Sequence, residues 1–210
     1  MKKIKLVFQG DSITDGSRDV RDLHQMGESY PKYASEQLRR ELPEIDFEFI
    51  NQGIGGNRTD QLFDRLYLDA IAFEPDIISV LIGINDIWAR ISSRRIGTTY
   101  EQIEANFRAI LQSLRQNTHA KIVVMTPYLL DCTDKESVRA DLPQLQEIIR
   151  RLALEYADLL IPLDELFEEA MKTQPHPLYF SGDGVHPNAN GAAFIGKCYA
   201  DAVKPLLQSM

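Results

Sequence analysis

Five short apolar runs alternate with longer amphipathic segments along this chain, and the alternation constrains its fold more than any other feature. Most positions within each run are apolar one after another, which is typical of strands that are covered on both faces. The segments between the runs have helical length, and two of them end just before a proline. The predicted strands are 4–8, 47–50, 77–82, 122–125 and 159–163. The predicted helices are 30–42, 59–73, 98–116, 143–156, 164–172 and 190–207.

The order strand, helix, strand, helix predicts a parallel sheet with helices on both faces. Thr98 and Glu101 have capping-box spacing and are expected to open the helix that reaches about Gln116. Because crossovers are right-handed, few topologies remain. We expect one α/β domain over 1–210, a three-layer α/β/α sandwich around a flavodoxin-like five-stranded sheet of order 2-1-3-4-5. Ligands bind beyond the carboxyl ends of such strands. Two segments there, 86–97 and 127–142, are predicted to be long loops.

The charge balance limits the choice of partners. The chain has 210 residues, with 23 Lys and Arg against 31 Asp and Glu, so its formal charge is −8. Nucleic acid and anionic membrane surfaces are therefore poor partners. No run approaches the ~18 consecutive apolar residues of a membrane span, and the apolar stretch near the start is too short for a secretory signal. We expect a cytoplasmic protein. The sequence leaves its oligomeric state open, a homo-oligomer included.

The first predicted strand leads into Gly10-Asp11-Ser12-Ile13-Thr14. A serine directly after a strand and flanked by glycines can be an exposed nucleophile. The segment is not a G-x-S-x-G elbow, because position 14 is threonine. A tight strand-to-helix turn with Ser12 as the helix cap also explains these residues, and on this motif alone it is the favoured interpretation.

The next two strands lead into Gly53-Ile54-Gly55-Gly56 and Gly83-Ile84-Asn85-Asp86. Glycines let a ligand approach backbone N–H groups closely, but neither the lysine of a P-loop nor the spacing of a dinucleotide fingerprint is present. A flexible turn explains the glycines equally well. Asn85 could direct its amide into a crevice, although an Asx-turn is the favoured explanation when Asn85 is taken alone.

Asp183 and His186 lie three positions apart in the segment Asp183-Gly184-Val185-His186-Pro187. A local turn would let the carboxylate accept from Nδ1–H and hold Nε2 toward a partner. Together with Ser12 and two oxyanion donors, this pair completes the set of groups that acyl transfer requires.

Other candidate sites are weaker. His24, His119 and His176 have no zinc-like spacing, and the acidic stretch 131–136 lacks the pattern of a calcium loop. Cys132 and Cys198 lie in no metal or redox spacing. Arg90, Arg94 and Arg95 could bind an anion, but a solvated face is the better expectation. We therefore expect no metal and no organic cofactor.

The four motifs, in this order and over nearly the whole chain, resemble the SGNH superfamily of GDSL-type esterases and lipases. The resemblance implies ester hydrolysis on a flavodoxin-like α/β/α sandwich. It implies Ser12 as nucleophile, Asp183 and His186 as acid and base, and an oxyanion hole made by the N–H groups of Ser12 and Gly56 with the Asn85 amide. Gly53 and Gly55 compete with Gly56 for that assignment. Ile13 stands where the GDSL pattern has leucine.

Within the superfamily, the stretches 10–15, 83–88 and 125–128 are similar to acetyl-xylooligosaccharide esterases. This similarity implies a short acyl group, acetyl above all, on a carbohydrate. Trp88, the large ring just past Asn85, is expected to bind substrate near the acyl or sugar site, and Asp11 is a further candidate for substrate binding. Packing against the end of the sheet is an equal alternative for Trp88. The rival activities are a lysophospholipase or thioesterase for longer acyl chains and a non-catalytic carbohydrate-binding module. Polar residues in the two long segments argue against a long apolar groove: Arg90, Ser92, Ser93, Arg94, Asp131, Asp134 and Glu136.

Overall fold

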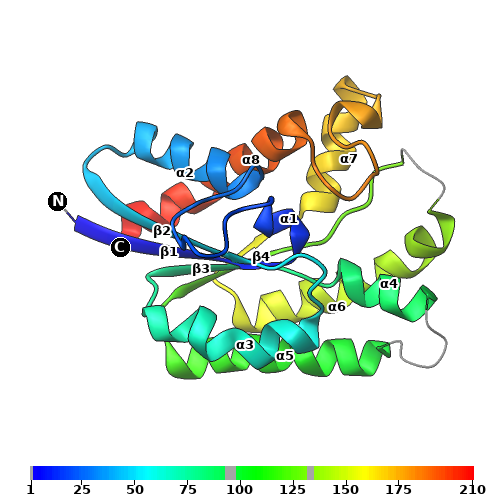
Figure 1. Cartoon of the computed structure of the whole chain (residues 1–210), viewed down its shortest axis with the longest axis horizontal. Coiled ribbons are helices and arrows are strands. Elements are labelled where there is room, and N and C mark those ends of the chain that lie inside the picture. The colour runs from blue at the N-terminus through cyan, green and yellow to red at the C-terminus, as the bar shows by residue number, and fades with distance from the viewer. Residues whose placement is uncertain (1, 93–97, 132–134) are drawn as a thin grey trace.

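A five-stranded parallel sheet forms the centre of the molecule (Figure 1). The computed structural model describes residues 2–92, 98–131 and 135–210. The strand order is β2-β1-β3-β4-β5, so the predicted sheet order is confirmed. The strands are β1 (Lys2–Gly10), β2 (Ile45–Gly53), β3 (Ile77–Leu81), β4 (Lys121–Met125) and β5 (Leu159–Ile161). β1 and β2 are longer than their apolar runs because they pair in register from Lys2 and Ile45 to Gly10 and Gly53.

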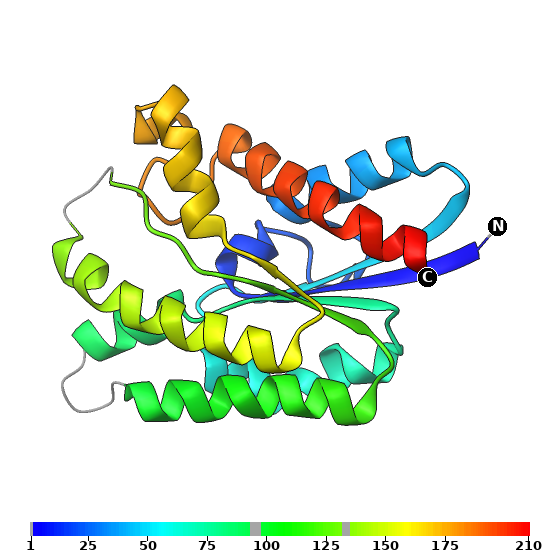
Figure 2. The same ribbon diagram turned by 180° about the vertical axis from the view of Figure 1, so that it is seen from behind.

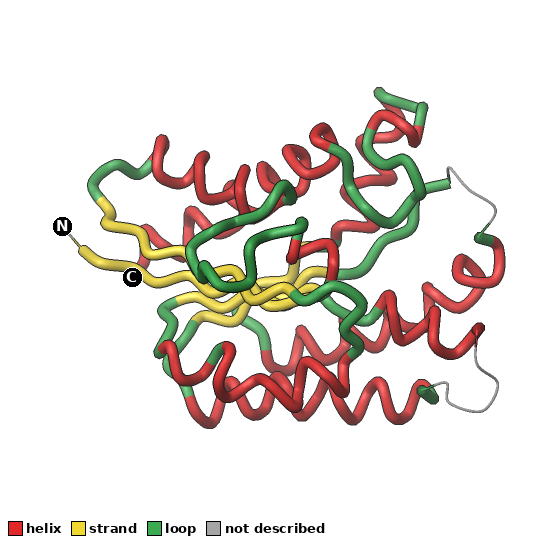
Figure 3. Tube along the Cα trace, in the orientation of Figure 1, coloured by secondary structure: helices red, strands yellow, loops and turns green. Residues whose placement is uncertain are grey.

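Helices cover both faces of the sheet, which gives the three predicted layers (Figures 1 and 2). One face carries α2 (Tyr30–Glu41), α7 (Leu163–Thr173) and α8 (Ala189–Ser209). The other face carries α3 (Thr59–Asp69), α4 (Ile84–Ser92), α5 (Tyr100–Asn117) and α6 (Glu136–Tyr156). Figure 3 shows the strands in yellow between these two red layers. A single turn, α1 (Ser12–Asp15), follows β1 directly.

The core lies on both faces of the sheet, as the continuous apolar runs predict. Leu6, Val7 and Phe8 are all 0 % exposed. The Phe8 ring lies 5.7 Å from that of Tyr30 in α2 and 5.2 Å from that of Tyr199 in α8, centroid to centroid. Full burial of such a side chain is worth about 1.5–3 kcal/mol. This packing anchors the end of β1, where the first motif begins.

The starts of α5 and α6 differ from the sequence prediction in ways that have a physical reason. Thr99, rather than Thr98, caps α5: its hydroxyl accepts from the Gln102 N–H at 3.2 Å, and the Gln102 side chain accepts from the Thr99 N–H at 2.8 Å. The predicted Thr98–Glu101 box is therefore wrong by one position, because two overlapping pairs have the same spacing. A physical preference for either pair cannot be seen in the sequence.

The second difference is the start of α6, at Glu136 instead of Pro143. The sequence predicts Pro143 in the first turn of this helix, whereas it lies inside the helix. Val138, Leu142 and Leu145 are buried along one face, so their packing offsets the hydrogen bond that Pro143 cannot donate. The two predicted long loops are correspondingly shorter, since α4 occupies most of the first and α6 the end of the second. None of the helices in the described part of the chain is long and apolar enough to cross a membrane.

Candidate active site

The structure brings Ser12, His186 and Asp183 together at the carboxyl end of the sheet. The Ser12 Oγ lies 2.9 Å from His186 Nε2, across 174 positions of sequence. The His186 Nδ1 lies 2.7 Å from Asp183 Oδ2. Ser12 comes from the end of β1, and the other two come from the loop between α7 and α8. The result is an unbroken hydrogen-bonded chain from carboxylate to imidazole to hydroxyl.

Asp11, not Ser12, caps the short helix after β1. Its Oδ1 accepts from the Ile13 N–H at 3.0 Å, and its backbone oxygen accepts from the N–H groups of Thr14 and Asp15. The interpretation of Ser12 as the cap is therefore wrong. Ser12 is the first helical residue, so its N–H has no partner within the helix and points out at the N-terminus.

The segment 181–187 holds the aspartate and the histidine in one turn. Asp183 Oδ1 accepts from the N–H groups of Val185 at 2.9 Å and His186 at 2.7 Å. Burial raises the pKa of Asp183, but the hydrogen bonds from the His186 ring and these two N–H groups outweigh it and hold the pKa well below its ordinary value. Asp183 is therefore a carboxylate throughout the neutral range.

Ser181 organises this loop and was missed in the sequence. Its hydroxyl lies 2.7 Å from the backbone oxygen of His186 and accepts from the Gly184 N–H at 2.9 Å. Ser181 is fully buried and pairs with Pro187 in an isolated antiparallel bridge. Its only sequence signal is a serine two residues before Asp183, which is too common a pattern to be diagnostic.

The glycine-rich loop offers one free backbone donor at this edge. The Gly53 N–H donates to Asn51 Oδ1 at 2.9 Å, and the Gly55 N–H donates to Asp15 Oδ2 at 3.0 Å. Within the described residues the Gly56 N–H has no hydrogen-bond acceptor. Gly56 has φ +80°, a conformation that favours glycine. The hydrogen bonds thus favour Gly56 over Gly53 and Gly55 as the donor to an oxyanion.

Asn85 lies at the start of α4, beside this loop. One hydrogen of its Nδ2 donates to the backbone oxygen of Asn57 at 3.0 Å, which leaves the other N–H for a ligand. The next residue, Asp86, accepts from the N–H and the hydroxyl of Thr59 at 3.0 and 2.7 Å. Asp86 therefore ties the start of α4 to the start of α3.

Two buried carboxyl groups lie next to the site. Burial raises the pKa of Asp11 to about 7 and that of Asp86 to about 6. Asp11 is 1 % exposed, and its Oδ2 has no partner among the described residues. The expectation that Asp11 contacts substrate is not supported by this placement, because the side chain faces inward and caps α1.

Trp88 and Lys135 lie on the rim next to Asp183. The Lys135 Nζ lies 5.5 Å from the Trp88 ring centroid and 3.9 Å from Asp183 Oδ2, and it donates to the Asp183 backbone oxygen. Trp88 is half-buried and packs against the core, so part of its ring contributes to core packing. Arg90, further along α4, packs its guanidinium 4.0 Å from the Tyr100 ring centroid. Ser93, Arg94, Arg95, Cys132 and Asp134 lie outside the described residues.

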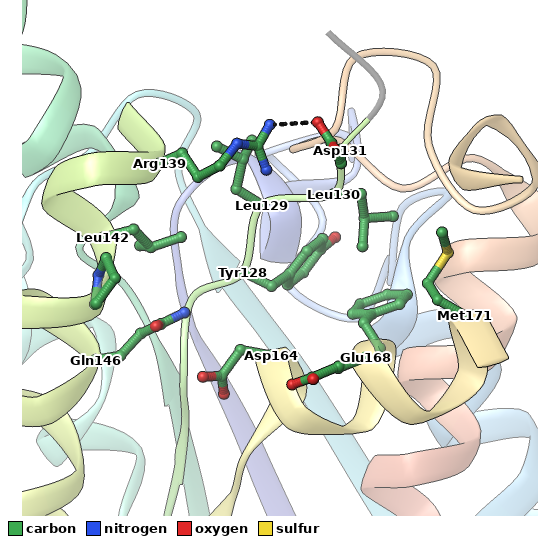
Figure 4. A pocket seen from close by; sticks show the side chains of 12 residues that line it. Tyr128, Leu129, Leu130, Asp131, Arg139, Leu142, Gln146, Asp164, Glu168 and Met171 are labelled. Atoms are coloured by element: carbon green, nitrogen blue, oxygen red, sulfur yellow. Dashed lines mark ion pairs between the residues drawn. The ribbon is translucent and has the colours of Figure 1, made fainter. Parts of the chain in front are cut away.

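A cavity with both apolar and polar lining residues lies beside the segment that follows β4 (Figure 4). It has a volume of about 340 Å³ and is walled by this segment, α6 and α7. An ion pair of 2.9 Å between Asp131 and Arg139 spans its upper side in Figure 4. Its described lining includes neither Ser12 nor Asn85 nor His186, so the cavity does not extend the site around Ser12. No group of three or more metal-ligating side chains occurs within the described residues.

A serine hydrogen-bonded to a histidine–aspartate pair at the carboxyl end of a parallel sheet is typical of a hydrolase of the serine type. Comparison with known proteins is more specific. The sequence matches the GDSL-like Lipase/Acylhydrolase family over residues 8–194, and the chain belongs to this family. It is a GDSL-type, or SGNH, esterase.

Characterised relatives share the fold over nearly their whole length. The acetylxylan esterase of Geobacillus stearothermophilus is 28% identical over 202 residues, which cover 93% of this chain and 91% of the relative. The crystal structure of Axe2, an acetylxylan esterase from the same organism, superposes with a TM-score of 0.87 over 96% of this chain and 94% of that one, at 27% identity. LAE5, an α/β hydrolase from the metagenome of Lake Arreo, superposes with a TM-score of 0.86 over 95% and 94%, at 26% identity.

Variants of Axe2 that are described as catalytic mutants replace a serine, a histidine and an aspartate by alanine. The aspartate and the histidine lie three positions apart in that protein, as Asp183 and His186 do here. The residue types and this spacing agree with the hydrogen-bonded set in the present structure.

Proposed function

We propose that this esterase hydrolyses short acyl esters, acetyl above all, on a carbohydrate, with Ser12 as nucleophile. The observation that carries the proposal is the unbroken hydrogen-bonded chain Asp183–His186–Ser12. Ser12 Oγ attacks the ester carbonyl while His186 Nε2 takes its proton. Asp183 accepts from Nδ1–H, fixes the tautomer, and stabilises the imidazolium that forms.

The oxyanion of the tetrahedral intermediate is held by three donors, the N–H groups of Ser12 and Gly56 and the second Nδ2–H of Asn85. His186 then gives its proton to the leaving alcohol oxygen as the carbon–oxygen bond breaks, which leaves Ser12 acylated. A water molecule that gives a proton to His186 attacks the acyl-enzyme. As that intermediate collapses, the bond between Ser12 Oγ and the acyl carbon breaks, His186 returns its proton to Oγ, and the acid is released.

Two observations support the substrate class. The acetylxylan esterases among the relatives carry that activity in their names. The cavity beside α6 and α7 is not lined by the reacting groups, so it gives no groove for a long acyl chain bound to Ser12. The lysophospholipase or thioesterase alternative therefore has less support. The bonded triad argues against a module that only binds carbohydrate.

A series of esters of increasing acyl length tests the proposal, with an acetylated xylo-oligosaccharide included. We expect kcat/KM to be highest for acetyl or propionyl and to decline well before octanoyl, with free acetate released from the oligosaccharide. A steady rise to octanoyl, or activity that increases when micelles form, would identify the long-chain activity instead. Binding of the oligosaccharide without Ser12-dependent turnover would identify a binding module.

A further inference from the structure

Arg65 of α3 contacts the segments that carry the proposed oxyanion donors, and all three of its side-chain nitrogens donate hydrogen bonds. Nε donates to Asn57 Oδ1 at 2.8 Å, and Nη2 donates to the Gly10 backbone oxygen at 3.0 Å. Nη1 donates to the Gln52 backbone oxygen at 2.8 Å and to Asp69 Oδ2 at 3.0 Å. The side chain is only 15 % exposed. One guanidinium therefore joins the ends of β1 and β2 to the glycine-rich loop.

Each of the three oxyanion donors is connected to this guanidinium. Gly10 precedes Ser12 by two residues, and its backbone oxygen also accepts from the Ile54 N–H at 3.1 Å. Asn57 directly follows Gly56, so fixing its side chain fixes the peptide unit next to the Gly56 donor. The backbone oxygen of the same Asn57 accepts from Asn85 Nδ2 at 3.0 Å.

We propose that Arg65 is a positioning residue that aligns the Gly56 and Asn85 donors through Asn57, and so sets how well this esterase stabilises the oxyanion. The inference rests on the function proposed above. Arg65 touches no reacting atom, since its partners are the acceptor groups of Gly10, Gln52, Asn57 and Asp69. A guanidinium suits this place because its five donors, spread over a planar fork, serve four fixed acceptors at once, whereas the lysine ammonium has three donors on a single nitrogen.

The test is a double-mutant cycle between Arg65→Lys and Asn85→Ala, read as kcat and KM on one acetyl ester. Arg65→Lys should lower kcat by about 10-fold to 100-fold with KM changed less than about twofold, because the donors act on the transition state. In the Asn85→Ala background, Arg65→Lys should cost clearly less, because the part of its effect that acts through the Asn85 amide is already lost. Full multiplication of the two effects, or a raised KM at unchanged kcat, would overturn the inference.

Arg108→Lys is the matched control. Arg108 also makes several hydrogen bonds, to Glu155, Tyr156 and Glu104, but these lie on α5 and α6 away from the site. Its replacement should leave kcat unchanged. Asn57→Ala is the second variant in case Arg65→Lys does not fold; it removes the acceptor of Nε and keeps the backbone oxygen that Asn85 uses. It should lower kcat in the same way, and an unchanged kcat would refute the role of Arg65.

The kinetics of these variants show whether the role of Arg65 or the proposed function is wrong. If Asn85→Ala leaves kcat unchanged, the oxyanion hole itself is wrongly assigned. If Asn85→Ala lowers kcat while Arg65→Lys and Asn57→Ala do not, the oxyanion hole stands and only the role of Arg65 falls.

Discussion

Asn85 has one side-chain hydrogen held by the backbone oxygen of Asn57 and one free, which fixes the amide in direction without exhausting its donors. Because the amide is held in place before the reaction starts, its free N–H can be aimed at the position of the tetrahedral oxyanion instead of the planar carbonyl oxygen. Asn85→Ala should therefore lower kcat by about 10²-fold with little change in KM.

Steady-state kinetics on an acetyl ester measure this effect. Asn117→Ala, at the far end of α5, is the control and should behave like the wild type. A raised KM at constant kcat would make Asn85 a residue that binds the substrate in its ground state.

Asp11 gives a prediction about the pH dependence of stability. Its carboxyl has a pKa of about 7 in the folded chain, whereas an unfolded chain releases this proton near pH 4. The group therefore contributes stability below about pH 4 that is lost as the pH rises to about 7. Asp11→Asn keeps the helix cap, because asparagine caps as well as aspartate, but removes the buried charge.

The free energy of unfolding, from urea denaturation at pH 5 and pH 8, measures this contribution. The variant should gain a few kcal/mol relative to the wild type between these two values. A difference between variant and wild type that is constant with pH would show that Asp11 is not held neutral by its burial.

At the scale of elements, the site is assembled where three helices begin. Ser12 opens α1, Thr59 opens α3, and Asn85 lies in the first turn of α4. Asp86 joins α4 to α3 through two hydrogen bonds from Thr59. The alignment of the Asn85 amide with the glycine-rich loop therefore depends on this link between helices.

Thr59→Val tests the link, since valine keeps the shape of threonine and removes the hydroxyl that Asp86 uses. The free energy of unfolding should fall by about 1–3 kcal/mol above pH 6, where Asp86 is ionised, and by less at pH 5. The kcat should fall as well. Thr173→Val, on the exposed end of α7, is the control and should change stability by less than about 0.5 kcal/mol. Equal losses at pH 5 and pH 8 would count against the Asp86 link.

The sequence predicts the strands better than the helix starts. Continuous apolar runs define β3 and β4 because both faces of these strands are buried. The start of α6 is missed because the packing of Val138 and Leu142 tolerates Pro143 inside the helix, and packing partners are not visible in the sequence.

The meeting of Ser12, His186 and Asp183 could be predicted, because Ser12 follows a strand and the other two lie in a loop at the same edge of the sheet. The roles of Gly56 and Asn85 as oxyanion donors stay predictions. Arg65 and Ser181 could not be predicted. Both act on backbone oxygens, and a sequence does not show which carbonyl groups a side chain will meet.

At the scale of the whole molecule, the chain joins at one edge of the sheet groups that are far apart in sequence. Residues near position 12 and position 186 meet because β1 lies in the sheet interior and the loop before α8 returns to its carboxyl end (Figure 1). The exposure of His186 and the partial exposure of Ser12 leave the pair open to an ester from solvent.

Covalent labelling with a fluorophosphonate probe, followed by intact-mass and peptide analysis, tests the central claim most directly. The probe reacts with a serine only when a base activates it, so it reports the Ser12–His186 pair itself. We expect one adduct per chain, on the peptide that contains Ser12, with labelling absent in Ser12→Ala and strongly slowed in His186→Ala. Labelling of another serine, such as Ser181, or equal labelling of Ser12→Ala would contradict the assignment of Ser12 as the nucleophile.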